Sequence, residues 1–424
     1  MNAKSKLLVA TLYGATAIGM AGLALGSASH ADEKKPTVTR EAAKPLQAAQ
    51  KDVNEGKYRE ALAELQKVEA MPKKNAYDMH VVNEFSAFSY VKTNNLAEAA
   101  KRWEALIGDG FTPPAEANMR VKNLATIYYE LKQYPKAAQW GEKAIKGGFA
   151  TADTYTLVAQ AYYLQGDFAA TRRFTEGYVN EQIKRGETPK EPALQLVLSS
   201  CVKLSDSTCV QRSLDHLVTY YPKPEYWQDL VDSLFNSKSA EGSDVDLLNI
   251  YRLALDVNAI TRGQQYTEMA QLALEQGSPG EAQQALERAF AKNIFTDQRE
   301  RERNERLLAS AKKQAASDQA ALDELAKAAA ASATGEKDAA LGIAYLSYGQ
   351  YDKAVNALQQ GLMKGSLKNL TQATLLLGIA ELKSGKRDQA IKTFHQVTGD
   401  PTLVRLANLW SLHARAPDST VASR

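Results

Sequence analysis

Two cysteines are the residues of this chain whose type and spacing are best suited to chemistry. Cys201 and Cys209 are separated only by the short segment 202–208. If one helix ends near residue 204 and the next begins near residue 208, the two thiols face each other across a hairpin turn. A disulfide there would close a short loop and stabilise the fold by roughly 2.5 kcal/mol. The alternative is a pair of buried thiols, whereas a catalytic redox pair would have the spacing Cys-x-x-Cys.

The histidines do not form a metal-binding pattern. Apart from one in the leading segment, they are scattered through the sequence and show neither His-Glu-x-x-His nor Cys/His ligand spacing. They are His80, His216, His395 and His413. The chain also lacks a phosphate-binding Gly-x-x-x-x-Gly-Lys-Ser/Thr loop and a Gly-x-Ser-x-Gly nucleophile elbow. We therefore expect no catalytic residues, no metal and no cofactor, and a protein that is not an enzyme.

Residues 1–31 are typical of a targeting segment. Lys4 and Lys6 precede an almost wholly apolar or small run over residues 7–25, and residues 29–31 carry small side chains where a signal peptidase would cleave. The run is long enough to remain as a membrane anchor, but its glycines and the cleavage site favour removal. We expect cleavage after Ala31 and a periplasmic protein without stable membrane insertion.

The charge of the chain excludes a general affinity for nucleic acid. Lysine and arginine number 52 against 49 acidic residues. Residues 1–31 contain two lysines and no acid, so the exported chain would carry 50 basic and 49 acidic residues. This balance provides no broad positive field to attract a polyanion.

A recurring phrase predicts the elements that position any site. It consists of a turn residue, an aromatic or large residue, and an alanine three positions later. The large residues stand at positions 58, 96, 134, 168, 279, 351 and 387, and the alanine follows at all of them except 168. The first four are 38, 38 and 34 residues apart, and the step from 351 to 387 is 36. Such a period predicts a stack of helical hairpins.

These markers resemble those of the tetratricopeptide repeat. Nine and six residues before five of these markers stand small or aromatic residues like those that this family uses to pack its first helices. They are Ala87 and Tyr90, Ala125 and Tyr128, Ala159 and Tyr162, Ala270 and Ala273, and Gly342 and Tyr345. The resemblance covers most of residues 44–400. It implies an all-α fold, a right-handed superhelix of helical hairpins.

The expected organisation follows from these markers and comprises about ten hairpins. We expect residues 298–332, which are charged and rich in alanine, to form one of them. The expected divisions are a signal peptide 1–31, a polar segment 32–43, about four repeats in 44–182, central repeats with the cysteine hairpin in 190–295, further repeats in 296–400, a capping helix 401–415 and a loose tail 416–424.

The family resemblance also implies where a partner would bind, because its first helices line the concave face. Mapped onto this chain, that face carries Glu84, Phe88, Lys122, Thr126, Tyr129, Gln160, Tyr163 and Gln271. Its mixture of aromatic and polar groups suits an extended peptide or a helix. In the pairs 128–129 and 162–163, one tyrosine belongs to the packing pattern and only the second is available to a ligand. For Phe88, packing against a neighbouring hairpin remains an alternative.

A narrower resemblance concerns residues 225–295. The sequences Tyr226-Trp227-x-x-Leu230, 268–274 and 291–295 are similar to exported repeat proteins associated with the TonB system. The similarity implies a periplasmic scaffold or adaptor that binds a protein or peptide segment of a cell-envelope complex, in TonB-dependent transport. The alternative is an accessory subunit of a cell-wall or polysaccharide assembly or export system, binding glycan or an enzyme partner.

Overall fold

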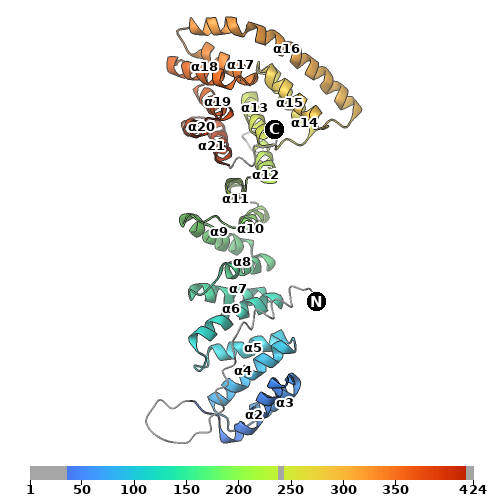
Figure 1. The fold of residues 1–424 in the computed structure, drawn as a ribbon, viewed down its shortest axis with the longest axis vertical. Helices are drawn as coiled ribbons and strands as arrows, with labels where there is room; N and C mark the ends of the chain where they lie inside the picture. Colours follow the sequence, from blue (N-terminus) through green and yellow to red (C-terminus); the bar gives the residue numbers. More distant parts are fainter. Residues whose placement is uncertain (1–35, 237–242, 417–424) are drawn as a thin grey trace. The chain divides into compact units, whose positions relative to one another are not determined.

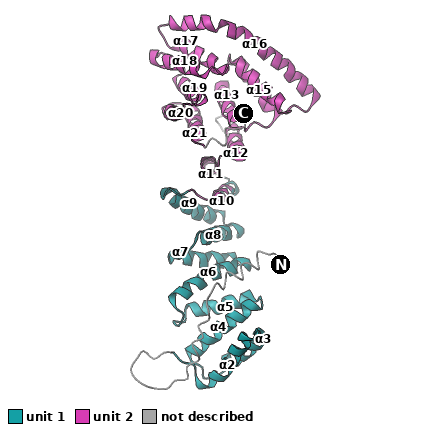
Figure 2. Cartoon of the chain, in the orientation of Figure 1, with its two compact units in different colours: residues 1–187, 199–205 teal, residues 188–198, 206–424 magenta. Residues whose placement is uncertain are grey.

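The computed structural model describes residues 36–236 and 243–416 and divides into two compact units. Unit 1 comprises residues up to 187 together with 199–205, and unit 2 comprises 188–198 and residues from 206 onward (Figure 2). The expected signal peptide 1–31 lies outside the described residues, as do positions 417–424 of the expected tail.

The described residues form 20 helices and no strand, which confirms the all-α prediction (Figure 1). None of these helices combines the length and the apolar character needed to cross a bilayer. The helices from the start of unit 1 to the cysteine hairpin are α2 (Arg40–Asn54), α3 (Tyr58–Glu69), α4 (Ala76–Lys92), α5 (Leu96–Ile107), α6 (Pro114–Glu130), α7 (Tyr134–Lys146), α8 (Ala152–Leu164), α9 (Phe168–Lys184), α10 (Glu191–Lys203) and α11 (Ser207–Tyr220). Those that follow are α12 (Pro224–Phe235), α13 (Asp244–Asp256), α14 (Gly263–Glu275), α15 (Pro279–Ala291), α16 (Gln298–Ala330), α17 (Glu336–Ser347), α18 (Tyr351–Lys364), α19 (Leu370–Lys383), α20 (Arg387–Phe394) and α21 (Pro401–Arg415).

The turn residue of the recurring phrase has a left-handed backbone. In eight hairpins the residue two positions before the second helix has a positive φ, between 54° and 85°. Glycine adopts this conformation without steric cost, which explains its frequency there. The turn residues are Gly56, Asn94, Lys132, Gly166, Ser205, Gly277, Gly349 and Gly385.

The alanine of the phrase allows the two helices of a hairpin to approach closely. Six of these alanines have no exposed surface: Ala61, Ala99, Ala137, Ala282, Ala354 and Ala390. Gly342 on α17 shows the same requirement, because a Cβ atom there would lie 2.5 Å from Cγ of Leu358 on α18. In unit 1, consecutive hairpins then share continuous apolar clusters, as expected of a repeat array.

Two expectations for local structure were wrong. Residues 298–330 form the single long helix α16 and not a hairpin. The reason is local: the segment contains no glycine or proline and is rich in alanine, glutamate, lysine and arginine, so nothing ends the helix. The polar segment expected up to residue 43 ends earlier, because Thr39 caps α2 and residues 40–43 are helical.

The last helix closes unit 2 upon itself. We expected residues 401–415 to cap the end of the array, and α21 does pack against α19 and α20 (Figure 1). It also packs against α11 and α13, with contacts that span 190 and 157 residues of sequence. Arg405 of α21 donates two hydrogen bonds to the carboxylate of Asp215 on α11, at 2.7 and 2.6 Å. Unit 2 is therefore a closed set of hairpins.

Candidate functional site

Unit 1 presents a row of side chains from successive first helices, which we call the first-helix row. It contains seven of the eight residues assigned to the concave face: Glu84, Phe88, Lys122, Thr126, Tyr129, Gln160 and Tyr163. They come from α4, α6 and α8, and none is fully buried. The eighth, Gln271, is exposed on α14 in unit 2 and is not part of this row.

Hydrogen bonds connect one first helix of the row to the next. The Tyr129 hydroxyl on α6 donates to the side-chain carbonyl of Gln160 on α8, at 3.1 Å. The Tyr163 hydroxyl pairs with the Ser199 hydroxyl on α10, at 2.7 Å. Between α4 and α6, Glu84 forms an ion pair with Arg120. The row is therefore preorganised by contacts that recur from hairpin to hairpin.

The aromatic members of the row rest edge-on against the marker residues of the repeat. Tyr129 contacts Tyr134 with ring centroids 5.7 Å apart, and Tyr163 contacts Phe168 at 5.2 Å. Phe88 contacts Tyr58 of the preceding hairpin at 6.0 Å. Edge-to-face contacts of this kind fix ring orientation. Sequence reasoning assigned the markers to hairpin packing and missed their second role as the base of the row.

The two tyrosines of each adjacent pair have different environments. Tyr128 is buried, and its hydroxyl donates to Glu104 at 2.6 Å; burial first, and then this carboxylate, raise the phenol pKa well above its usual value. Tyr162 donates to Glu142, and burial together with that contact raises its pKa to about 12. Tyr162, like Tyr129 and Tyr163, is only partly buried, so exposure separates the pair 128–129 but not the pair 162–163. The second pair differs in its hydroxyl partners: Tyr162 contacts Glu142 on α7, whereas Tyr163 contacts Ser199 on the next first helix, α10.

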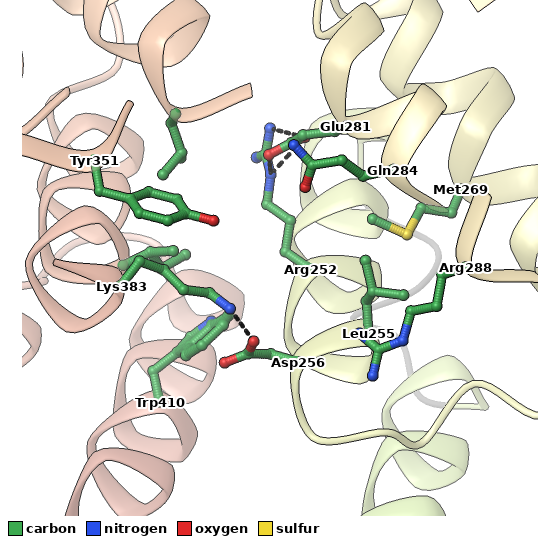
Figure 3. A pocket seen from close by; sticks show the side chains of 12 residues that line it. Arg252, Leu255, Asp256, Met269, Glu281, Gln284, Arg288, Tyr351, Lys383 and Trp410 are labelled. Atoms are coloured by element: carbon green, nitrogen blue, oxygen red, sulfur yellow. Dashed lines mark hydrogen bonds and ion pairs between the residues drawn. The ribbon is translucent and has the colours of Figure 1, made fainter. Parts of the chain in front are cut away.

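Unit 2 contains a cavity of about 130 Å³, which we call the unit 2 cavity. Helices α13, α14 and α15 line one side of it, and α17, α18, α19 and α21 line the other (Figure 3). The family resemblance implies that first helices line the inner face, yet α13 and α15 are second helices. The last helix, α21, contributes Trp410 to the same lining.

Five charged side chains line the unit 2 cavity, and four of them form two ion pairs. Arg252 donates to both oxygens of Glu281, with nitrogen–oxygen distances of 2.9–3.1 Å. Lys383 pairs with Asp256, whose other oxygen lies 3.1 Å from Nε2 of His413. Burial alone would raise the pKa of Asp256, but the His413 hydrogen bond and the Lys383 charge lower it to about 2. The fifth charged residue is Arg288.

The cysteines and histidines have structural environments. Cys201 and Cys209 are buried and disulfide-bonded. Nδ1 of His80 lies 2.7 Å from an Asp109 carboxylate oxygen, and the ring stacks on Tyr77. His413 contacts Asp256 and the ring of Trp227. His395 Nε2 lies 3.4 Å from the Ser411 hydroxyl on α21. These contacts join neighbouring elements.

The fold defines a class: an α-solenoid of helical hairpins. More particularly, a model of the tetratricopeptide repeat family matches residues 87–154, from within α4 to the start of α8. The chain therefore carries tetratricopeptide repeats there, and hairpins outside the match have the same turn and alanine positions. No curated protein matches the chain.

Several solved structures are similar to this chain. A tetratricopeptide repeat protein from Parabacteroides merdae is 13% identical, covering 64% of this chain and 99% of its own, with a TM-score of 0.27. The C-terminal part of a TPR repeat-containing protein from Cytophaga hutchinsonii is 15% identical, covering 62% and 94%, with a TM-score of 0.30. The TPR2AB domain of yeast Sti1, in a complex with pHSP90, is 14% identical, covering 64% and 98%, with a TM-score of 0.32.

Proposed function

We propose that this protein is a non-catalytic periplasmic scaffold whose first-helix row binds an extended segment of a cell-envelope protein. The segment belongs, in this proposal, to a complex of the TonB type. Export rests on residues 1–31, and the TonB association rests on the resemblance of residues 225–295 to exported repeat proteins of that system.

The observation that carries the proposal is the pair Tyr129 and Tyr163. Each ring makes an edge-to-face contact with a marker residue of its own hairpin. Each hydroxyl also forms a hydrogen bond with a side chain of the next first helix. Tyrosines fixed in this way contribute contact area with little loss of side-chain entropy on binding. Between them, Thr126 and Gln160 offer hydroxyl and amide groups to a peptide backbone. Lys122 on α6 adds a positive charge that suits an acidic residue in the bound segment.

The test measures binding of purified periplasmic domains of TonB and ExbD to the exported protein. Fluorescence anisotropy would compare wild type with the double variant Tyr129→Ala/Tyr163→Ala. Tyrosines that act as binding hot spots each contribute at least about 1–2 kcal/mol, so the double variant should weaken binding by roughly 30-fold or more.

The matched control is Tyr155→Ala/Tyr178→Ala. These two rings stack 4.2 Å apart in unit 1 and are not members of the row, so their loss should leave binding unchanged. Equal weakening by both double variants would contradict the site. Failure of both domains to bind the wild-type protein would refute the TonB part of the proposal.

The mass of the exported protein tests its localisation separately. We expect a chain that begins at residue 32, recovered from the periplasmic fraction. Retention of residues 1–31 would indicate a membrane-anchored protein and would refute the proposed cleavage.

A further inference from the structure

The unit 2 cavity is independent of the first-helix row and has its own polar character. Arg252 is only 7% exposed, and it keeps a bidentate ion pair with Glu281 beside the cavity. Burying such a pair is seldom the most stabilising choice, because well-packed apolar residues often do as well or better. Its presence at the wall of a cavity is easier to explain if the cavity receives a polar ligand.

Two buried donors, one on a residue that lines the cavity and one on a residue bonded to Arg252, have no acceptor among the described residues. Trp410 lines the cavity at 1% exposure, and its Nε1 has no hydrogen-bond partner in the described part of the chain. Asn249 is fully buried, with its Oδ1 bound by Arg252, and its Nδ2 is likewise without a partner there. Buried polar atoms are nearly always satisfied in native proteins. Both orphans are N–H groups, so the group that satisfies them must supply acceptor atoms.

The charge balance of the cavity points to an anion. Arg252, Arg288 and Lys383 carry three positive charges against two from Asp256 and Glu281. Arg288 forms no ion pair with a described residue, and its only recorded partner is the neutral amide oxygen of Asn258. Lys292 shares that oxygen at 3.4 Å; burial and then the charge of Arg288 lower the lysine pKa. Lys292 is exposed and is not a lining residue, so the positive charge at this wall that lacks a carboxylate partner is that of Arg288.

The remaining lining and the size of the cavity limit the ligand. Leu255, Met269 and Leu346 supply apolar surface, and the Tyr351 hydroxyl points inward from the opposite side (Figure 3). A single water needs only about 10–15 Å³ of such a cavity. The observed 130 Å³ is therefore larger than one water requires, yet too small for a folded segment of a partner.

We propose that the unit 2 cavity binds a small free carboxylate that carries a short apolar group. Its oxygens accept hydrogen bonds from donors of the cavity wall, including Trp410 Nε1, and Arg288 balances its charge. The apolar group lies against Leu255 and Met269. Because α21 contributes Trp410, the bound carboxylate also stabilises the closed form of unit 2.

Isobutyrate is a suitable probe, with isobutyramide as a neutral molecule of the same shape and inorganic phosphate as an anion without an apolar group. Ligand-observed NMR on the full exported chain would measure their dissociation constants. We expect saturable isobutyrate binding with a constant on the order of 1 mM, reasonable for a ligand of this size. Isobutyramide and phosphate should each bind at least roughly tenfold more weakly, because one lacks the charge and the other the apolar contact.

Two substitutions locate the site. Arg288→Gln removes the unpaired charge and should weaken isobutyrate binding roughly tenfold or more. Trp410→Phe keeps a large ring but removes the N–H donor, and it should also weaken isobutyrate binding. The controls are Arg303→Gln, an exposed arginine on α16, and Trp227→Phe, a buried tryptophan outside the cavity lining. Both controls should bind as wild type does.

The outcomes separate the carboxylate proposal from a water-filled cavity. Circular dichroism would first establish that each variant is folded. Absence of saturable binding, equal affinity for isobutyrate and isobutyramide, or full affinity in folded Arg288→Gln would each overturn the proposal. Preference for phosphate over isobutyrate would overturn the assignment of the ligand class.

Discussion

Units 1 and 2 use the same hairpin phrase to make different surfaces. In unit 1 the phrase recurs at each hairpin, and the second tyrosines of α6 and α8 form an accessible row. In unit 2 the alternation is interrupted by α16, and α21 returns to contact α11 and α13. The result is a cavity with charged walls.

The difference shows that the repeat determines how neighbouring helices pack but not what surface the array presents. Contacts inside a hairpin depend on small residues such as Ala137 and Ala354, which are alike in both units. The surface depends on residues that vary between repeats and on which helices face them. Unit 2 has two departures from the repeat, α16 and α21, and the second of them supplies Trp410 to the cavity lining.

The largest expected effect comes from removing the side chain at the closure of unit 2. Trp410→Ala deletes a fully buried ring that stacks near Phe394 and lines the cavity, and should cost about 3–5 kcal/mol. Hydrogen exchange should accelerate in α11, α13 and α21, while α4–α8 keep wild-type protection. Comparable loss of protection in unit 1 would show that closure is not a property of unit 2 alone.

The ion pairs of Asp256 should make the closure of unit 2 sensitive to acid. Its folded pKa, about 2, is below the ordinary aspartate value of 3.8, so the folded state favours the carboxylate. This contribution, about 2 kcal/mol, is present above pH 4 and is lost as the pH falls toward 2. Denaturant unfolding from pH 6 to pH 2.5 would measure it. In Asp256→Asn this component of the pH dependence should be absent, and an unchanged pH dependence would contradict the assignment.

Glu381 should give unit 2 a pH dependence of the opposite sign. The carboxyl is 1% exposed and accepts a hydrogen bond from Thr393 at 2.6 Å, and burial raises its pKa. Its stabilising effect is complete below the unfolded pKa and declines as the pH rises through the folded pKa. Glu381→Gln keeps an acceptor without a charge and should stabilise the protein at pH 7 by about 1 kcal/mol. Reduced stability of this variant at pH 7 would show that the carboxylate is favoured.

The smallest expected effect tests the turn that both units share. Lys132 in unit 1 has φ 57°, and Gly349 occupies the equivalent position in unit 2 with φ 68°. Lys132→Gly should stabilise the protein by about 0.5–1 kcal/mol, because glycine adopts this conformation without strain. Gly349→Ala should destabilise it by a similar amount. Thermal unfolding of both variants would measure these effects. Changes in melting temperature of the same sign would contradict the idea that the two positions have the same backbone requirement.

Much of the fold could be predicted from the sequence because its determinants are local. In three hairpins the second helix begins at the expected marker, which is Tyr58, Tyr134 or Tyr351. The last helix, α21, spans the expected residues 401–415. The prediction of a hairpin over 298–332 failed because alanines in the repeat's frame do not make a turn without a residue that ends the helix. The distinction between Tyr128 and Tyr129 was also accessible, since it follows from helical periodicity.

The unit 2 cavity could not be predicted in the same way. Arg252 and Asp256 are four residues apart and so share one face of a helix, but nothing in the sequence relates them to Lys383 or Trp410. Their proximity depends on the contact of α21 with α13, which joins positions such as 256 and 413. The same limit applies to Tyr134 and Phe168, whose part in the first-helix row depends on the angle between helices.

The sequence by itself determined the hairpins, because turn residues, buried alanines and helix-forming segments act over a few neighbouring positions. It also indicated which tyrosines of unit 1 are committed to packing. Only the tertiary structure decided that α21 closes unit 2 and that five charged side chains meet there. The physical reason is range: helix formation and hairpin packing are set by nearby residues, whereas closure brings together side chains separated by well over one hundred positions.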